Sequence, residues 1–152
     1  DAAGNQSAAS PVTAVTLPVD TDLALHKQVT ASSFSAGHEP GLAVDGDLST
    51  RWAQGLGLPD PSWIQVDLGT VTSIKSVVTT FELPSGYEYL LEYSADGANW
   101  STFDDHTASR TTDRANYSFL SQPVDARYVR LTVTNSNWNG GSIYGLQVYG
   151  GF

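Results

Sequence analysis

The sequence predicts an all-β chain that folds as a sandwich or a barrel. Segments dense in Val, Ile, Thr, Tyr and Phe recur between clusters of Gly, Pro, Asn, Asp and Ser, so that a turn signal comes about every 8 to 12 residues. No segment keeps the apolar period of a helix over three turns. Apolar residues make up 40% of the 152 residues, which suffices for one sizeable core and fits one domain.

The strands are predicted from local patterns. The clearest is the alternation of Ile64, Val66 and Leu68 with polar or bulky neighbours, which is typical of a half-buried strand. The Asp96-Gly97 pair predicts a hairpin turn. The expected strands, in chain order, are residues 29–34, 63–68, 71–82, 87–93, 101–103, 115–120, 128–135 and 143–149.

The first 20 residues differ from the rest of the chain. Residues 1–20 are small, polar and interrupted by proline, which predicts an inter-domain linker, with a short docked segment at 12–19. We therefore expect the domain at residues 21–152, as a module of a longer chain. There is no apolar run long enough to span a membrane.

Charge and cysteine content exclude several classes of function. The chain has 7 Lys and Arg against 16 Asp and Glu, a formal net charge of −9, which disfavours nucleic acid and anionic membrane surfaces as partners. With no cysteine, disulfides, thiolate metal sites and thiol catalysis are excluded. A neutral ligand, a cationic ligand or a metal ion fits this composition.

A set of short phrases stands in order along the chain. These are Leu23-Ala24 with Lys27 and Thr30-Ala31-Ser32-Ser33, Ala43-Val44-Asp45-Gly46-Asp47 with Thr50-Arg51-Trp52, Trp63-Ile64-Gln65-Val66-Asp67-Leu68-Gly69, Tyr93-Ser94-Ala95-Asp96-Gly97 with Trp100, Ala126-Arg127-Tyr128-Val129-Arg130-Leu131, and Leu146-Gln147-Val148-Tyr149-Gly150. The order resembles the discoidin, or coagulation factor 5/8 type C, superfamily, and within it the family 32 carbohydrate-binding modules of bacterial glycan-degrading enzymes. The resemblance covers residues 23–150 and implies a jelly-roll β-sandwich of the galactose-binding-domain type.

A calcium site is expected in the loop at residues 45–50, where oxygen donors surround Gly46. The resemblance implies one structural calcium ion, bound by two carbonyl oxygens, one carboxylate and both oxygens of a threonine, from Leu42, Asp45, Asp47 and Thr50. The family usually closes this site with a glutamate, but Gly145 stands there in this chain, so we expect a weak site. The alternative is a turn in which aspartates cap backbone amides.

Sugars are bound by aromatic faces and planar polar side chains, which points to the loops at one end of the sandwich. Trp138 is the strongest signal, because its large ring is flanked by three Asn and two Gly; the alternative is that it folds back on the sandwich. Trp52 and Trp63 are instead expected in the core. The predicted carbohydrate-binding residues are Phe34, His38, Arg51, Glu82, Trp138, Asn139 and Tyr144.

Arg51 and Glu82 resemble the polar pair of related glucan- or chitosan-binding modules, although an ordinary ion pair is the alternative. The Tyr-Pro-Arg phrase of galactose-preferring relatives is absent around Pro84, which favours glucan or glucosamine polymers. The resemblance thus implies a non-catalytic module, secreted and monomeric, that targets the catalytic domain of its own parent chain, a glycoside hydrolase or polysaccharide lyase, to a polysaccharide.

Two other functions remain open at this point. One is a discoidin-type adhesion domain that binds a protein or a membrane surface. The other is a small glycosidase or lyase, which needs two carboxyl groups facing each other across a cleft. Glu39 and Glu82 are the nominal pair, but neither lies in a recognisable catalytic motif, so we expect no enzymatic activity.

Overall fold

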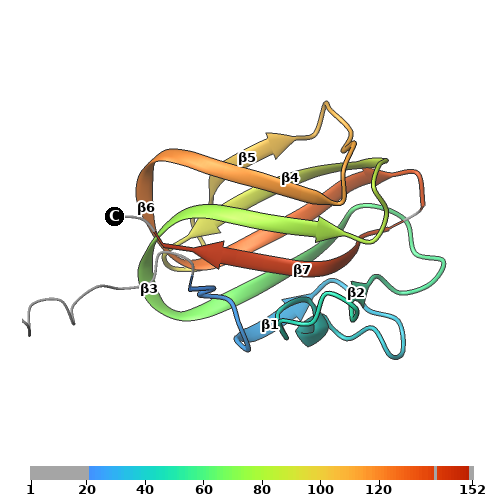
Figure 1. Cartoon of the computed structure of the whole chain (residues 1–152), viewed down its shortest axis with the longest axis horizontal. Coiled ribbons are helices and arrows are strands. Elements are labelled where there is room, and N and C mark those ends of the chain that lie inside the picture. Colours follow the sequence, from blue (N-terminus) through green and yellow to red (C-terminus); the bar gives the residue numbers. More distant parts are fainter. Residues whose placement is uncertain (1–20, 139, 151–152) are drawn as a thin grey trace, which may run out of the picture.

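Two very long strands organise the fold. The computed structural model describes residues 21–138 and 140–150, and within them β3 spans Ser62–Phe81 and β6 spans Ala115–Ser136. These strands pair antiparallel along both of their halves, with a break in register between Asp67 and Thr72. Both strands bend near this break in register, at one end of the molecule, so each contributes to both layers of the sandwich (Figure 1).

The shorter strands complete the two layers. In one layer, β1 (Gln28–Ala31) pairs with the first half of β3, while β4 (Tyr87–Ser94) and β5 (Ser101–His106) continue from the second half of β6. In the other, β7 (Ser142–Tyr149) pairs with the second half of β3, and β2 (Trp52–Ala53) pairs with β7. A short 3₁₀ helix, η2, spans Pro40–Ala43. The predicted all-β sandwich is confirmed.

The core lies between the two layers. Ile64, Val66 and Leu68 are buried, as their alternation predicts. Trp52 is fully buried, and its indole Nε1 donates a hydrogen bond of 2.9 Å to the carbonyl oxygen of Ser33. Burial of a side chain this large stabilises the fold by about 3 kcal/mol and fixes the short strand β2 against the core.

The structure differs from the predicted elements in several respects. The strand expected at 29–34 ends at Ala31, where the chain bends, and the strand expected at 101–103 continues to His106. The strands expected at 63–68 and 71–82 are one strand, as are those expected at 115–120 and 128–135, because β3 and β6 continue to pair on the far side of both bends. Neither β2 nor η2 is predicted. The prediction that Trp63 lies in the core is wrong: its side chain is half-buried, because its neighbour Ile64 takes the inward position.

The two ends of the described domain lie side by side. Asp22 forms an antiparallel bridge with Tyr149, and the amide of Leu23 donates to the carbonyl oxygen of Val148 at 2.7 Å. The Asp22 carboxylate also accepts the amide of Val148 at 3.0 Å. The beginning of the described chain is therefore fixed to the last residues of β7. The predicted linker at 1–20 lies outside the described residues.

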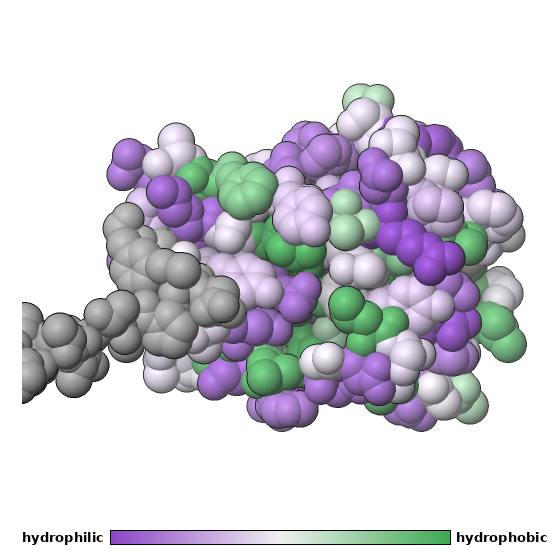
Figure 2. Space-filling view, in the orientation of Figure 1, coloured by the Kyte–Doolittle hydropathy of each residue, from purple (hydrophilic) through white to green (hydrophobic). Residues whose placement is uncertain are grey.

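The surface in the view of Figure 2 carries apolar side chains in small groups between hydrophilic ones. No helix among residues 21–138 and 140–150 has the length and apolarity needed to cross a membrane.

An ion pair joins β3 and β6 at their bends. Arg127 donates from Nε and Nη2 to the two carboxylate oxygens of Asp67, at 2.8 and 2.9 Å. The same carboxylate accepts the amide of Gly69, whose φ of 95° lies in the left-handed region. Hydrogen bonding by the Arg127 guanidinium holds the pKa of Asp67 below its ordinary value. The pair therefore stabilises the fold when Asp67 is ionised.

We expect Asp67→Asn to lower the free energy of unfolding by about 1 kcal/mol at pH 7. Because the pKa of Asp67 is lower in the folded than in the unfolded state, this stabilisation is present above the ordinary carboxyl range and is lost as the pH falls through the folded pKa. Urea unfolding at pH 7 and at about pH 2 measures the difference. The exposed Asp125→Asn is the control, and an equal loss for both variants at pH 7 would contradict this role.

Candidate functional site

Four chain segments meet at one end of the sandwich because neighbouring strands run antiparallel. The end of β3, the start of β4, the end of β6 and the start of β7 lie together there. A cavity of about 470 Å³ opens between their loops and the segments around β2. Its lining consists of Ser35, Ala36, His38, Arg51, Ala53, Gln54, Gly55, Leu56, Gly57, Glu82, Tyr87, Trp138, Gly140, Gly141 and Ser142.

One wall of the cavity carries a group of polar side chains. Arg51 lies 3.2 Å from Glu82, measured from Nε to Oε1, so the ion pair expected from the sequence is present. Nε of Arg51 also donates to the hydroxyl of Ser142 at 3.0 Å, and Nη1 lies 3.4 Å from Nδ1 of His38. The Arg51 and Glu82 side chains remain 26% and 31% exposed. Donors and acceptors are therefore held in fixed positions while still reachable by a ligand.

Trp138 lies in the cavity lining on the loop between β6 and β7. Its side chain is 55% exposed, so it is not folded into the core. The indole Nε1 is 3.4 Å from the carbonyl oxygen of Ser85, which lies in the loop before β4. A large ring left open to solvent in a concave site is suited to stack against the apolar face of a ligand.

The floor of the cavity is tightly packed. The amide of Gly141 donates to the Ser62 hydroxyl at 2.9 Å, and a Cβ at this position would lie 2.9 Å from both that hydroxyl and the Trp52 ring. Tyr87 also lines the cavity and is buried, and this burial, followed by the charge of Glu82, raises the pKa of its hydroxyl to about 12. The Tyr87 hydroxyl therefore stays protonated and uncharged at neutral pH.

The loop predicted to bind calcium is held by its own hydrogen bonds. The hydroxyl of Thr50 lies 2.6 Å from Oδ2 of Asp45 and 2.9 Å from the carbonyl oxygen of Asp47, so three of the expected ligand atoms converge. Oδ1 of Asp45 accepts the amide of Asp47 at 2.9 Å, as in the alternative of a capped turn. Asp45 is the single side-chain carboxylate among the ligands expected for a metal ion here.

The position of the usual closing glutamate is filled differently. A Cβ on Gly145 would lie 2.9 Å from Cδ2 of Leu48, so a leucine side chain covers this glycine. Among the residues that the structure describes, no group of three or more His, Cys, Asp or Glu side chains is arranged to hold a metal ion. Any calcium bound here would depend mainly on neutral oxygen ligands, which favours low affinity.

The structure brings together four of the predicted carbohydrate-binding residues, namely His38, Arg51, Glu82 and Trp138, in one cavity lining. Phe34 is 51% exposed but is not part of that lining, and neither is Tyr144 on β7. Asn139 lies outside the described residues.

Tyr87 and Ser142 line the cavity although neither is among the predicted carbohydrate-binding residues. Each is the first residue of a strand, β4 and β7 respectively. Both follow short segments that contain glycine, residues 82–86 and 137–141, and this position is the signal that would have pointed to them.

Comparisons with known proteins show what the chain is similar to. The F5/8 type C domain family matches residues 28–146. The non-catalytic subunit of the venom prothrombin activator omicarin-C from Oxyuranus microlepidotus is 31% identical over 124 residues; the match covers 70% of this chain but only 8% of that protein.

Among solved structures, chitosan-binding module 1 of a chitosanase/glucanase from Paenibacillus sp. IK-5 is 34% identical, with a TM-score of 0.76 over 86% of this chain and 99% of that one. Module 2 of the same enzyme, solved with chitotriose, is 33% identical, with a TM-score of 0.75 over 85% and 100%. The family 32 module of C. perfringens NanJ, solved with galactose, has a TM-score of 0.72 over 82% and 93%. At 18% identity it shows a shared fold only.

We expect Gly141→Ala to lower the free energy of unfolding by about 1 to 3 kcal/mol, because the added methyl group would press on Trp52 and Ser62 beneath the cavity. Gly41→Ala is the matched control, since a Cβ there meets no atom within 4 Å, and its effect should stay within about 0.5 kcal/mol. Urea denaturation measures both. Equal stability of the two variants would show that the floor can relax around the methyl group.

Proposed function

The chain belongs to the F5/8 type C domain family, and from this premise we propose that it is a module that holds a secreted enzyme on a glucosamine or glucose polymer. The observation that carries the proposal is the cavity in which the exposed Trp138 ring accompanies the Arg51–Glu82 pair. A pyranose ring presents an apolar C–H face and a rim of hydroxyl or amino groups, which these two features complement.

The module binds and does not catalyse. The F5/8 type C domain is a binding module, and the similar solved structures are carbohydrate-binding modules. Glu82 is the one carboxylate among the described cavity-lining residues, and it is engaged by Arg51. Glu39, the other nominal candidate, accepts the amide of Gly37 at 3.1 Å and does not line the cavity. A glycosidase would need a second carboxyl group facing the first.

Binding would rest on stacking and hydrogen bonds. The sugar face would lie on the Trp138 ring, and Arg51 and Glu82 would exchange hydrogen bonds with groups on the sugar rim. Because the two charges of the pair offset each other, the cavity recognises neutral hydroxyls as readily as an amino group. The formal charge of −9 over the whole chain adds a long-range attraction for a polycation such as chitosan.

The biological role would follow from tethering. A module that binds one stretch of polymer keeps a linked catalytic domain at a high effective concentration near further substrate. The natural partners would be the polysaccharide and the catalytic domain of the same parent chain, outside the cell, with the module acting as a monomer. The identity of 33–34% to two chitosan-binding modules supports the glucosamine polymer as the first ligand to test.

We also propose that the loop at residues 45–50 binds calcium weakly, through Leu42, Asp45, Asp47 and Thr50. The convergence of oxygen atoms around the Thr50 hydroxyl supports this site, and the Leu48 side chain over Gly145 limits its affinity. The ion would supply only charge and cross-linking within the loop. The turn formed by the hydrogen bonds of Asp45 would persist without it.

Trp138→Ala should abolish retention of the protein in an electrophoresis gel that contains chitosan, because the stacking surface is lost. The substitution leaves the net charge unchanged, so it separates binding in the cavity from simple attraction of an acidic protein to a polycation. Phe119→Ala is the matched control, since Phe119 is an exposed aromatic outside the cavity. Equal retention of both variants in the chitosan gel would contradict the cavity as the binding site. Gels that contain β-glucan, galactan or anionic vesicles test glucose polymers, galactose polymers and membrane surfaces as ligands.

Calcium should raise the melting temperature by roughly 4 °C over that in EDTA, because an ion that binds only the folded loop stabilises it by mass action. Thermal unfolding followed by circular dichroism measures the shift. Asp45→Ala should remove the response to calcium by removing the one carboxylate that the Thr50 hydroxyl contacts. A melting temperature that is the same in calcium and in EDTA would rule out the site.

A further inference from the structure

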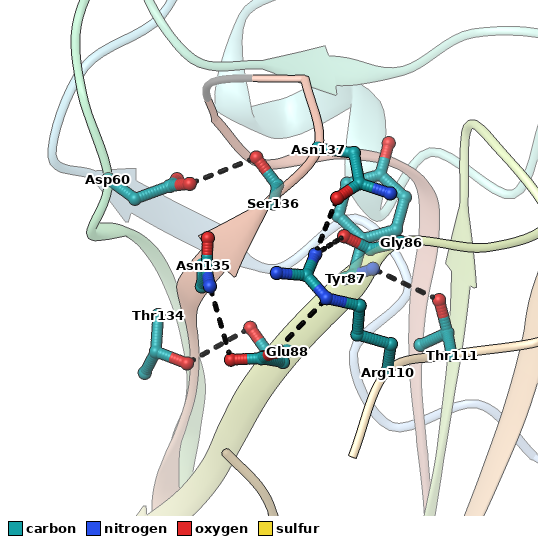
Figure 3. A network of polar contacts seen from close by, with 10 residues as sticks. All are labelled: Asp60, Gly86, Tyr87, Glu88, Arg110, Thr111, Thr134, Asn135, Ser136 and Asn137. Carbon is teal, nitrogen blue, oxygen red and sulfur yellow. Dashed lines mark hydrogen bonds and ion pairs between the residues drawn. The ribbon is translucent and has the colours of Figure 1, made fainter. Parts of the chain in front are cut away.

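A network of polar contacts joins three loops beside the cavity, and Arg110 lies at its centre (Figure 3). Nη1 of Arg110 donates to the carbonyl oxygen of Gly86 and to Oδ1 of Asn137, both at 2.8 Å. Its Nε lies 3.1 Å from Oε1 of Glu88 on β4. One guanidinium thus joins the loop before β4 to the loop after β6. Arg110 itself does not line the cavity.

The anchor of this network is the sheet. Glu88 is only 20% exposed, and its second carboxylate oxygen lies 3.4 Å from the side-chain amide of Asn135 on β6. The hydroxyl of Thr134 donates to the carbonyl oxygen of Glu88 at 3.1 Å. Glu88 is therefore held by two neighbours on the adjacent strand, and it in turn orients Arg110.

The loop that carries Arg110 is itself fixed to β4. The amide of Thr111 donates to the carbonyl oxygen of Tyr87 at 2.9 Å, and the amides of Gly86 and Tyr87 donate back to the carbonyl and hydroxyl oxygens of Thr111, both at 3.3 Å. These backbone contacts fix where the Arg110 side chain begins. They would remain in a variant that changes only that side chain.

The acceptors of Arg110 adjoin the residues that position Trp138. Gly86 follows Ser85, whose carbonyl oxygen lies 3.4 Å from the Trp138 indole, and Asn137 precedes Trp138 itself. The amide of Asn137 also donates to the carbonyl oxygen of Gly86 at 3.1 Å. Gly86 has a φ of 100°, and a Cβ on it would lie 2.8 Å from Nδ2 of Asn137, so the two loops approach closely.

We propose that Arg110 is a positioning residue for the sugar site: by joining Gly86, Asn137 and Glu88, it fixes the Trp138 ring relative to the polar wall of the cavity and so sets affinity. Trp138 is more than half exposed and has one long hydrogen bond of its own, so little else among the described contacts restrains it. A ring held in place before binding loses less conformational freedom when the ligand arrives. The affinity effect rests on the proposed function, whereas the effect on the ring does not.

The test compares Arg110→Gln with Arg114→Gln in the whole chain. Both substitutions remove one positive charge from the same loop, but the exposed Arg114 side chain makes no hydrogen bond or ion pair within the described part of the chain. Calorimetric titration with a soluble chitosan oligosaccharide should give about tenfold weaker binding for Arg110→Gln and no change for Arg114→Gln. Arg110→Lys should recover part of the loss, since an ammonium group can still reach one or two of the same acceptors.

A second measurement follows the Trp138 ring without ligand. Each protein is compared with the same protein carrying Trp138→Phe, and acrylamide quenching is measured for both. Subtracting the two fluorescence signals removes the contribution of the other three tryptophans and leaves that of Trp138. The quenching rate should rise in Arg110→Gln and stay unchanged in Arg114→Gln. If Arg110→Gln fails to fold, Glu88→Gln, which removes the charge that orients Arg110, should give the same two effects in milder form.

The outcomes separate this inference from the proposed function. If the unsubstituted protein binds chitosan and Arg110→Gln matches Arg114→Gln in affinity and quenching, Arg110 is not a positioning residue and the proposed function stands. If the unsubstituted protein binds no polysaccharide, the proposed function fails. The quenching comparison then decides alone whether Arg110 fixes the ring.

Discussion

The continuity of β3 and β6 through both layers is the constraint on which the rest of the molecule depends. Each strand crosses the sandwich in one direction within one layer, bends near the Asp67–Arg127 ion pair, and returns within the other. Because the neighbouring strands are antiparallel to them, the loop from β3 to β4 and the loop from β6 to β7 lie at a single end. The cavity opens at that end, between these loops and the segments around β2.

The floor of this site and the loops beside it are held by close packing and hydrogen bonds, while the side chains proposed to bind the ligand stay partly exposed. Gly141 and Trp52 form a floor with no room for a methyl group, and Arg110 ties the neighbouring loops to the sheet through Glu88. Above this floor, Arg51, Glu82 and Trp138 remain open to solvent. An ion pair of this exposure adds little to stability, so its hydrogen-bonding groups are free to serve a ligand at small cost to the fold.

Most of the fold is readable from the sequence, and part of the site is. Alternation places Ile64, Val66 and Leu68 inward, and the same period, applied strictly, would have placed Trp63 outward. The sequence does not show that the strands predicted on either side of Gly69 are one strand, because glycine occurs both in turns that end a strand and at bends within one. In the structure Gly69, with its positive φ, lies at a bend within β3. Arg51 and Glu82 were predicted from family resemblance, whereas Arg110 carries no local signal: its partners are distant in sequence and meet only through strand register.

The pairing of Asp22 with the end of β7 determines where the two ends of the described domain lie relative to the cavity. Ser142 opens β7 beside the cavity and Tyr149 closes it beside Asp22, so the length of one strand, roughly 25 Å, separates the two regions (Figure 1). The two ends of the described domain therefore lie away from the cavity. A ligand can therefore reach the mouth of the cavity without passing either end of the described domain.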